Sequence, residues 1–599
     1  METRNFYIRG FVILIGLIFL IKLFGIQVLS KDYKLAAENN IVQRIIEYPY
    51  RGLIYDRHHK LMVVNKPIYD LMTVPREVKV KDTAQFCRVM HIAKKEFFQR
   101  YSEARKYSVI KPSVFLKQLS NTEFAEIQDR LIDYRGFYIV ARSVRGYPVH
   151  SLANALGYIG EISKKQLESD STGYYRMGDY IGISGIEEKY EKELRGERGV
   201  KYKIVNVRGV EQGSFEDGRN DTLSIPGENL ESSIDLELQQ YAEKLLAGKV
   251  GSLVAIEPST GEILSIVSSP SYDPEVLTGR LFPANFQVLQ YDTLVPLFNR
   301  PIMAMYPPGS MFKTIQALIA LQEKVITPVD EVYCDGSLIG DLAAPGYYNI
   351  TRGITYSSNN FFFQVFRRII NRNTDPSPFV DARAGLAKWR EYVRKFNLGT
   401  TPVIDLPNPK AGFIPGVEYY DKFYGKNRWK FSNIYSLCIG QGETLVTPLQ
   451  MANLAAIIGN RGFYYDPHII RSVGTTGLPV PEFRVRHMVG IDSVNFIPVI
   501  DGMEQVVKVG SGLRAYLPDV AVCGKTSTVE NPHGADHSGF MAFAPKDHPK
   551  IAIAVYVENA GWGGRAAASI GSLVIEKYLK GEISRPWLED YVLKGEFLY

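Results

Sequence analysis

A serine and a lysine three residues apart mark the part of this chain that could carry covalent chemistry. Ser310 follows the turn-forming run YPPG, and Lys313 lies at the start of an apolar run, Phe312 to Leu321, that predicts a helix. A serine hydroxyl is a poor nucleophile until a base removes its proton, and a lysine is such a base only as the neutral amine. Burial and the positive end of the helix dipole both favour that form. The Ser310 N–H at the helix start could also help to hold an oxyanion.

The pair taken alone has a simpler explanation. A helix-capping serine followed by an exposed helical lysine gives the same spacing, which is common by chance in long proteins. The chemical hypothesis therefore depends on further elements of the right kind.

A second element, Ser357-Ser358-Asn359, precedes the apolar run NFFFQVF. In the chemical interpretation, the Ser357 hydroxyl relays a proton between Lys313 and the leaving group. The Asn359 amide would orient Lys313 and a substrate amide. A capped buried helix explains the same residues equally well, and capping is compatible with catalysis.

A third element, Lys525-Thr526-Ser527-Thr528, lies in a segment that predicts a strand. Lys525 and Thr526 could bind a substrate carboxylate through charge-assisted hydrogen bonds, and the Thr528 N–H would be a second oxyanion donor. A polar edge strand is the alternative. Ser527 could crowd a bound acyl chain, or have little effect if its side chain points away.

Local patterns predict the elements that would position these residues. Strands at both ends of the second half, with helical segments between them, favour one mixed sheet with helices on its faces. We expect a hairpin over 251–269, a strand over 551–557, helices over 183–199, 235–246 and 566–579, and two short strands around Lys66-Pro67.

The N-terminus predicts a single membrane anchor. The run from Phe11 to Leu29 is broken only by Lys22 and Gln27, and a bilayer span needs about 20 apolar residues. Arg4 and Arg9 precede it, which places the N-terminus inside and the rest of the chain outside. A cleaved signal peptide is the alternative, but it would have a shorter apolar region and small residues at its end.

Composition excludes several other classes. The 599 residues allow two or three domains, and a net charge of +6 without a dense basic tract argues against a nucleic-acid binder. Cys334, Asp335 and Asp341 lie together, but no histidine occurs between residues 329 and 360, so we predict no metal and no cofactor. His533, Asp536 and His537 are more typical of a solvated loop than of a triad.

Together, the three elements resemble the signature of class B penicillin-binding proteins, with Ser527 where that signature has glycine. The resemblance covers nearly the whole chain, and its layout is most similar to the elongation-type members. It extends to these runs: RGLIYDR at 51–57, ISGIEEKYEKELRG at 183–196, GSLVAIEPSTGEILSIVSSPSYDP at 251–274, IGQGETLVTPLQMA at 439–452 and GFMAFAPKDHPKIAIAVYVENAG at 539–561.

The resemblance implies a mixed α/β (α+β) fold in three parts. We expect a cytoplasmic stub and transmembrane anchor at 1–30, an elongated β-rich pedestal of the dimerisation type at 31–228, and a transpeptidase domain at 229–599 with a mixed sheet flanked by helices. The location expected is the bacterial inner membrane, single-pass, with the catalytic domain in the periplasm.

The function implied is serine-type D,D-transpeptidation. Ser310, Lys313, Ser357 and Asn359 would act on peptidoglycan stem peptides, and β-lactams would acylate the same serine. Expected partners are a SEDS-family glycosyltransferase and proteins of the elongation complex. The alternative is a scaffold that activates such a glycosyltransferase, with catalysis weakened by Ser527. A β-lactamase or carboxypeptidase fits the large pedestal and the anchor less well.

Overall fold

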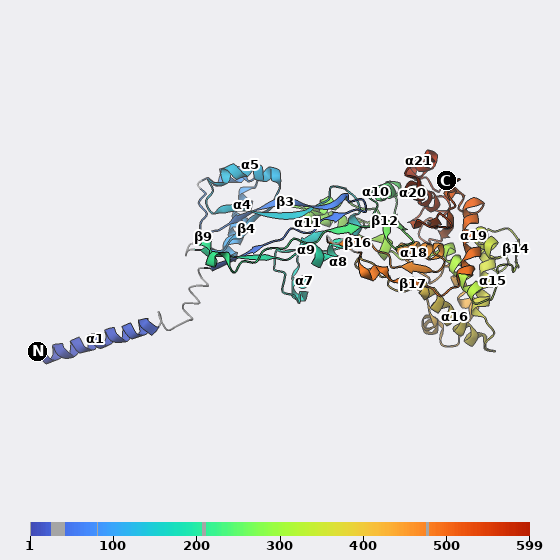
Figure 1. Cartoon of the computed structure of the whole chain (residues 1–599), viewed down its shortest axis with the longest axis horizontal. Helices are drawn as coiled ribbons and strands as arrows, with labels where there is room; N and C mark the ends of the chain where they lie inside the picture. Colours follow the sequence, from blue (N-terminus) through green and yellow to red (C-terminus); the bar gives the residue numbers. More distant parts are fainter. Residues whose placement is uncertain (1, 26–41, 81, 206–210, 475–478, 599) are drawn as a thin grey trace. The chain divides into compact units, whose positions relative to one another are not determined.

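A computed structural model describes residues 2–25, 42–80, 82–205, 211–474 and 479–598 (Figure 1). The chain forms two compact units, each built from three stretches. The smaller contains Met1–Gly52, Pro67–Ser143 and Arg195–Gly227, and the larger contains Leu53–Lys66, Val144–Leu194 and Glu228–Tyr599. The domain limits expected at residues 30 and 228 stay predictions.

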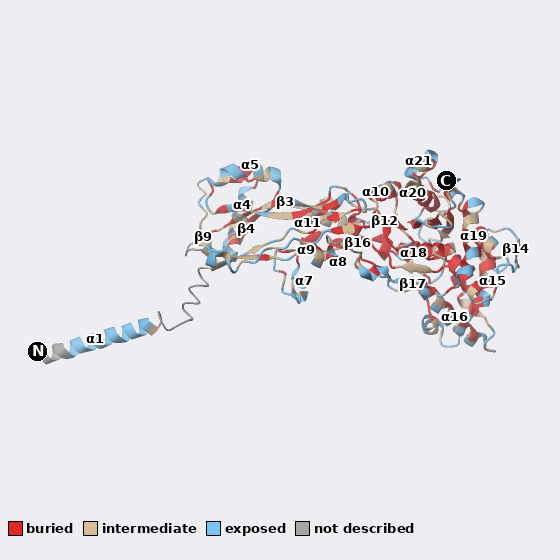
Figure 2. Cartoon of the chain, viewed as in Figure 1, coloured by how far each residue is buried: buried red, intermediate tan, exposed pale blue. Residues whose placement is uncertain are grey.

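The N-terminal helix α1 (Glu2–Phe24) is apolar along most of its length. Its segment Tyr7–Phe24 has a mean hydropathy of 2.2 and buries none of its residues, as the pale blue helix of Figure 2 shows. The helix is therefore long and apolar enough to cross a membrane. It overlaps the predicted span, of which residues 26–29 lie outside the described part of the chain.

The smaller unit packs short helices beside antiparallel strands, and its core is aromatic. Phe86 contacts the rings of Phe97, Phe115, Tyr134 and Phe137. One sheet has the order β1-β8-β9, and β4 pairs with residues 69–73 of β3. The bounds are β1 Val42–Glu47, β3 Leu61–Thr73, α3 Thr83–Val89, α4 Lys94–Tyr107, β4 Ser113–Leu119, α5 Asn121–Leu131, β5 Phe137–Gly146, β8 Gly199–Val205, β9 Glu211–Ser214 and the 3₁₀ turn η2 Phe215–Gly218.

The larger unit is organised around a five-stranded sheet of order β12-β11-β20-β19-β18, whose four neighbouring pairs are all antiparallel. The strands are β11 Gly251–Ile256, β12 Ile263–Ser269, β18 Cys523–Val529, β19 His537–Ala544 and β20 Ile551–Val557. Alternate side chains of β11 enter two different cores. Leu253 and Ala255 pack into one core with α10 (Leu236–Leu246) and α20 (Ala567–Lys580). Val254 and Ile256 enter the other.

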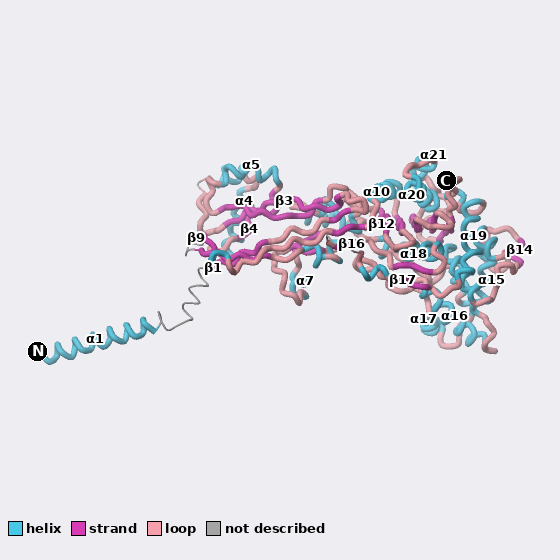
Figure 3. The backbone as a smooth tube through the Cα atoms, in the orientation of Figure 1, coloured by secondary structure: helices cyan, strands magenta, loops and turns pink. Residues whose placement is uncertain are grey.

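The second core contains the helices that carry the predicted site. They are α13 (Lys313–Gln322) and α15 (Asn359–Ile370), and the entirely buried α18 (Pro448–Gly459) packs into the same core. Figure 3 shows α15, α16 (Pro378–Lys395) and α19 (Phe496–Lys508) gathered as a helical cluster. The sheet therefore has helices on both faces, which confirms the predicted mixed α/β fold.

Shorter elements complete the larger unit. They are β2 Ile54–Tyr55, α6 Ala153–Leu156, β6 Ile159–Glu161, α7 Lys164–Ser169, β7 Tyr180–Gly182, α8 Gly185–Lys189, α9 Glu191–Arg195, β10 Leu230–Ser232, α11 Phe282–Tyr291, α12 Arg300–Met303, β13 Val332–Cys334, β14 Gly346–Tyr348, α14 Ile350–Thr355, α17 Val417–Tyr424, β15 Phe463–Tyr465, β16 Ile470–Val473, β17 Arg486–Met488, α21 Pro586–Lys594 and 3₁₀ turns η3 to η9.

Most of the local predictions are confirmed. The hairpin β11–β12, the strand β20 and the helices α10 and α20 lie where their patterns place them. Asp235 caps α10 by accepting from the Leu238 N–H at 3.1 Å. Two predictions are wrong in detail. The two strands around Pro67 are one strand, β3, because Pro67 falls between the residues that pair with β2 and those that pair with β4.

The helix expected over 183–199 is instead two short helices, α8 and α9, separated at Tyr190. Tyr190 has φ −105° and ψ 26°, outside the helical region. Its ring is buried in the second core, and its hydroxyl donates to Asp405 at 3.3 Å. A tertiary contact thus interrupts a sequence that is helical by its local pattern.

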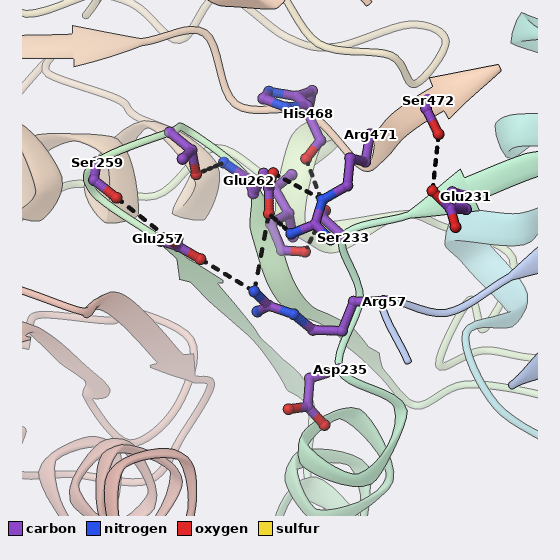
Figure 4. A network of polar contacts seen from close by, with 12 residues as sticks. Arg57, Glu231, Ser233, Asp235, Glu257, Ser259, Glu262, His468, Arg471 and Ser472 are labelled. Atoms are coloured by element: carbon purple, nitrogen blue, oxygen red, sulfur yellow. Dashed lines mark hydrogen bonds and ion pairs between the residues drawn. The ribbon is translucent and has the colours of Figure 1, made fainter. Parts of the chain in front are cut away.

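An ion-pair network fastens the segment around β2 to the central sheet (Figure 4). Arg57 pairs with Glu257 at 3.2 Å, and Glu262 on the β11–β12 turn binds both Nε and Nη2 of Arg471 at 3.0 and 2.7 Å. Arg57 also lies 4.0 Å from Glu262. Ser472 donates to Glu231 nearby at 2.9 Å. Because Glu262 and Arg57 are only 11% and 15% exposed, solvent screens this network weakly.

Candidate active site

Ser310 lies in a tight 3₁₀ turn, η4 (Gly309–Phe312), that leads directly into α13. Gly309 has φ +54°, and its N–H donates to Gly440 O at 2.9 Å. A Cβ at position 309 would lie 2.2 Å from Ser527 Oγ, so only glycine fits this close approach. The turn therefore presents Ser310 to a groove at the first exposed N–H groups of the helix.

Lys313 is fully buried at the start of α13. Its Nζ donates to Ser357 O at 2.6 Å and to Asn359 Oδ1 at 2.6 Å, and it lies 3.2 Å from Ser357 Oγ. The two carbonyl oxygens can only accept, so they occupy both N–H groups of a neutral amine. The lone pair of that amine is then left to accept a proton from a hydroxyl.

The surroundings of Lys313 favour the neutral amine. Burial lowers the pKa of Lys313 to about 8, although the charge of Asp341 opposes the shift and Cys438 opposes it less. A substantial fraction of Lys313 is thus unprotonated near neutral pH. The alternative of an exposed helical lysine does not fit this structure.

Ser357 lies between two buried lysines. Its Oγ accepts from Lys525 Nζ at 2.9 Å and lies 3.2 Å from Lys313 Nζ. Ser357 has φ +56°, an uncommon conformation for a residue with a side chain, at the turn between α14 and α15. Burial lowers the pKa of Lys525 well below its usual value, and the charge of Lys313 lowers it further. A hydroxyl between two amines can pass a proton in either direction.

The four residues of the third element lie on strand β18, so their side chains alternate between its two faces. Thr526 and Thr528 line the groove, whereas Lys525 and Ser527 point to the opposite side, as alternation along a strand requires. Ser527 is 1% exposed, and its hydroxyl donates to Pro308 O at 2.9 Å. The side chain of Ser527 therefore contacts the turn that carries Ser310 and does not line the groove.

The groove has a volume of about 870 Å³, large enough for an extended peptide. It brings Ser310, Ser357, Asn359, Thr526 and Thr528 together. Lys313 and Lys525 lie behind its wall. Further lining residues that the sequence did not single out include Tyr356, Ile439, Gln441, Arg514, Trp562 and Arg565.

Residues 340 and 341 also belong to this site. Asp341 lines the groove and accepts from Ser358 and from the Asn360 N–H. The sequence drew attention to Asp341 only as a possible metal ligand, and no local pattern connects it with the second element. Among the described residues, no cluster of three His, Cys, Asp or Glu side chains is arranged to hold a metal ion.

Two known domains match the chain. Residues 251–576, more than half of it, match the penicillin binding protein transpeptidase domain, and residues 46–232 match the penicillin-binding protein dimerisation domain. This chain belongs to the penicillin-binding protein transpeptidase family. The expected family is thereby confirmed.

Individual relatives place the chain within the family. The peptidoglycan D,D-transpeptidase MrdA of Acinetobacter baumannii is 28% identical over 600 residues, covering 94% of this chain and 86% of that protein. Penicillin-binding protein 2 of Helicobacter pylori, solved in complex with MreC, matches with a TM-score of 0.74 at 23% identity, covering 90% of this chain and 100% of that chain.

A second solved structure, "Structural coordination of polymerization and crosslinking by a peptidoglycan synthase complex", matches with a TM-score of 0.69 at 24% identity, covering 97% of this chain and 99% of that one. At these identities the two structures support the fold. With the curated relatives and both domain matches, they make the chain a class B penicillin-binding protein of the penicillin-binding protein 2 type.

The histidine loop of this transpeptidase lies at the edge of the groove. His537 begins β19, and its Nδ1 accepts from the Asn559 N–H at 3.2 Å. Burial lowers the pKa of His537. Asp536 lines the groove, and His533 is exposed. His533 thus has the exposed position expected of a solvated loop, whereas His537 is half-buried in a strand and hydrogen-bonded to a backbone N–H.

Proposed function

We propose that this peptidoglycan D,D-transpeptidase uses Ser310 as its nucleophile and Lys313 as the base. The observation that carries the assignment is the environment of Lys313, whose two N–H groups are held by carbonyl oxygens while its pKa is lowered to about 8. Such an amine accepts the Ser310 proton at little cost.

The reaction then follows in two acyl transfers. Ser310 Oγ attacks the penultimate D-Ala carbonyl carbon of a stem peptide while its proton passes to Lys313 Nζ. The C–N bond breaks, and the terminal D-Ala leaves after its nitrogen takes a proton relayed through Ser357. An amine of a neighbouring stem peptide next attacks the acyl-enzyme, loses its proton by the same relay, and releases Ser310.

Binding of the substrate is divided between side chains and backbone. The Thr526 hydroxyl reaches the groove and contacts the substrate carboxylate, while Lys525 adds positive charge from behind it. A carboxylate nearby raises the pKa of Lys525 again, so substrate binding favours its charged form. The N–H groups of Ser310 and Thr528 stabilise the oxyanion. Ser527 donates its hydroxyl to the Pro308 carbonyl of the turn that carries Ser310.

The scaffold alternative is not favoured. It required Ser527 to obstruct the substrate, but the side chain of Ser527 is buried on the opposite face of β18. Lys313, Ser357, Asn359 and Lys525 are also connected by hydrogen bonds, and Ser310 lines the same groove as Ser357 and Asn359.

We also propose the finer location and partners. Arg4 and Arg9, which precede the apolar run that starts at Phe11, support an inside N-terminus, with the catalytic domain in the periplasm of a bacterial inner membrane. β-Lactams acylate Ser310 as substrate mimics. A SEDS-family glycosyltransferase and elongation-complex proteins are the proposed partners, supported by similar proteins solved with MreC and in a peptidoglycan synthase complex.

Labelling with a fluorescent penicillin tests the nucleophile. The full-length protein in detergent should form a covalent adduct that survives denaturation, and Ser310→Ala should form none. Ser493→Ala changes an exposed serine that does not line the groove and should label like the wild type. A labelled Ser310→Ala protein, or an unlabelled wild type with an intact unfolding transition, contradicts the assignment.

A further inference from the structure

The loop between β13 and β14 forms hydrogen bonds with three consecutive residues at the second element, Ser358, Asn359 and Asn360. Gly340 O accepts from Asn359 Nδ2 at 2.8 Å. Asp341 Oδ2 accepts from Ser358 Oγ at 2.6 Å and from the Asn360 N–H at 2.8 Å. The loop thus binds Asn359 itself and the residue on either side of it.

These contacts fix the direction of the Asn359 amide. Its nitrogen donates to Gly340 O, so its oxygen must face Lys313 Nζ, which lies 2.6 Å away. A reversed amide would place its oxygen against the Gly340 carbonyl oxygen, which is a repulsive contact, and would remove the acceptor that holds a Lys313 N–H. The orientation that holds Lys313 therefore depends on where residue 340 lies.

Asp341 determines where residue 340 lies. Its second carboxylate oxygen accepts from the Ala343 N–H at 3.1 Å, which folds the loop around the carboxylate. Ser358 in turn caps α15 by accepting from the Phe361 N–H at 3.2 Å. The Asp341 carboxylate thus joins the β13–β14 loop to the start of α15 and to the turn that carries Ser357 and Ser358. Hydrogen bonds to a charged acceptor are stronger than those to a neutral one, so the link is strong.

Several ionisable groups face Lys313. They are Asp341 from the β13–β14 loop, Lys525 from β18 and Cys438 from the 3₁₀ turn η6 (Tyr435–Ile439). Asp341 is the acid among those that act on the pKa of Lys313, and its charge raises that pKa against the effect of burial. The same side chain therefore has a geometric and an electrostatic effect on the base.

We propose that Asp341 is a positioning residue of the transpeptidase reaction, holding Ser358 and Asn360 so that the Asn359 amide oxygen stays on Lys313. The proposal rests on the assignment of Lys313 as the base. It gives Asp341 a role that needs no metal ion. Asp341 acts through Asn359 and Lys313 and forms no bond to the reacting atoms.

Two variants of the full-length protein separate the two effects. Asp341→Ala removes all three hydrogen bonds and should slow acylation by a fluorescent penicillin roughly 10- to 100-fold, the cost of a misplaced catalytic group. Asp341→Asn keeps one oxygen acceptor but removes the charge. The pKa of Lys313 should then fall further, so the rise of the acylation rate with pH moves to lower pH.

Asp335 provides a matched control in the same loop. It is exposed, and its carboxylate accepts from the N–H and the hydroxyl of Ser337, which is a local turn contact. Asp335→Asn should keep the rate and the pH midpoint of the wild type. A midpoint shift in Asp341→Asn but not in Asp335→Asn reports the charge of Asp341 acting on Lys313. A larger loss of rate in Asp341→Ala than in Asp341→Asn supports positioning, because only the alanine variant removes every hydrogen bond of the carboxylate.

The possible outcomes distinguish a failure of the role proposed for Asp341 from a failure of the assignment of Ser310 as nucleophile. If the wild type labels at Ser310 while both Asp341 variants match it in rate and midpoint, the role of Asp341 is wrong and the nucleophile stands. If Asp335→Asn behaves like Asp341→Asn, the effect belongs to the loop as a whole and the proposal fails. If the wild type does not label at Ser310, the proposed function fails first.

Discussion

At the scale of single residues, two buried lysines share one hydroxyl. Lys313 and Lys525 both contact Ser357 Oγ, and each is fully buried. Two ammonium groups so close together and so poorly hydrated repel each other, so the site favours the loss of a proton. The base is thus prepared by its surroundings before any substrate arrives.

The first prediction concerns pH. Because only neutral Lys313 accepts a proton, the rate of Ser310 acylation should rise as pH increases through about 8, the pKa that burial gives Lys313. Rates of penicillin labelling between pH 6 and 9, corrected for spontaneous hydrolysis of the drug, measure this. A rate that falls or stays constant over that range would exclude Lys313 as the base.

The second prediction concerns Ser527. Since its side chain points away from the groove, Ser527→Gly should change the acylation rate by less than about threefold, a barrier change below about 0.7 kcal/mol. The variant should instead lose about 1 kcal/mol of stability with the hydrogen bond to Pro308. Labelling kinetics and thermal unfolding of the same preparation test both parts. A large gain in rate would show that the serine obstructs the substrate.

At the scale of elements, the central sheet and the segment around β2 are joined by buried charge. Glu262 receives two hydrogen bonds from Arg471 and lies near Arg57, so three parts of the sequence far from one another meet at one turn. Removing one member of such a group leaves the others poorly compensated.

Glu262→Gln should therefore destabilise the protein by on the order of 2 kcal/mol, since the charge that holds Arg471 is lost. Glu237→Gln is the control, because Glu237 forms an exposed ion pair with Lys60 and should contribute nothing measurable. The midpoint of thermal unfolding compares the two. Equal midpoints would mean that the network contributes no more than a surface pair.

Sequence patterns predicted where the helices and strands lie better than they predicted the contacts between these elements. The Ser310 and Lys313 pair was predictable because both residues lie on one short turn, and β20 because its apolar run is uninterrupted. The contact of Asp341 with Ser358 was not, since it joins residues 17 apart through an irregular loop. The side to which Ser527 points depends on the pairing of β18 with β19, and the local sequence does not determine that pairing.

At the scale of the whole molecule, the anchor and the cysteines together allow a test of topology. All four cysteines are free and buried. Burial raises the pKa of the Cys334 thiol to about 11 and those of Cys438 and Cys523 to about 12, so little reactive thiolate forms. The protein therefore has a low background for thiol labelling.

A single added cysteine should report its side of the membrane. In cells with a permeabilised outer barrier and an intact inner membrane, Ser493→Cys should react with a maleimide that cannot cross membranes. Asn5→Cys, which precedes the apolar segment Tyr7–Phe24, should react only after lysis. The reverse pattern would place the catalytic domain in the cytoplasm.

The alternation of β18 also has a consequence for resistance to inhibitors. Thr526 and Thr528 line the groove. Lys525 and Ser527 are on the other face of the strand, where Lys525 contacts Ser357 and Ser527 contacts Pro308. Drug selection can alter the first pair and change which ligands are tolerated while the acylation chemistry persists. Changes at Lys525 alter the proton relay through Ser357 for drug and natural substrate alike, whereas changes at position 527 affect chiefly stability. Adaptive substitutions on this strand should therefore accumulate on one face of it.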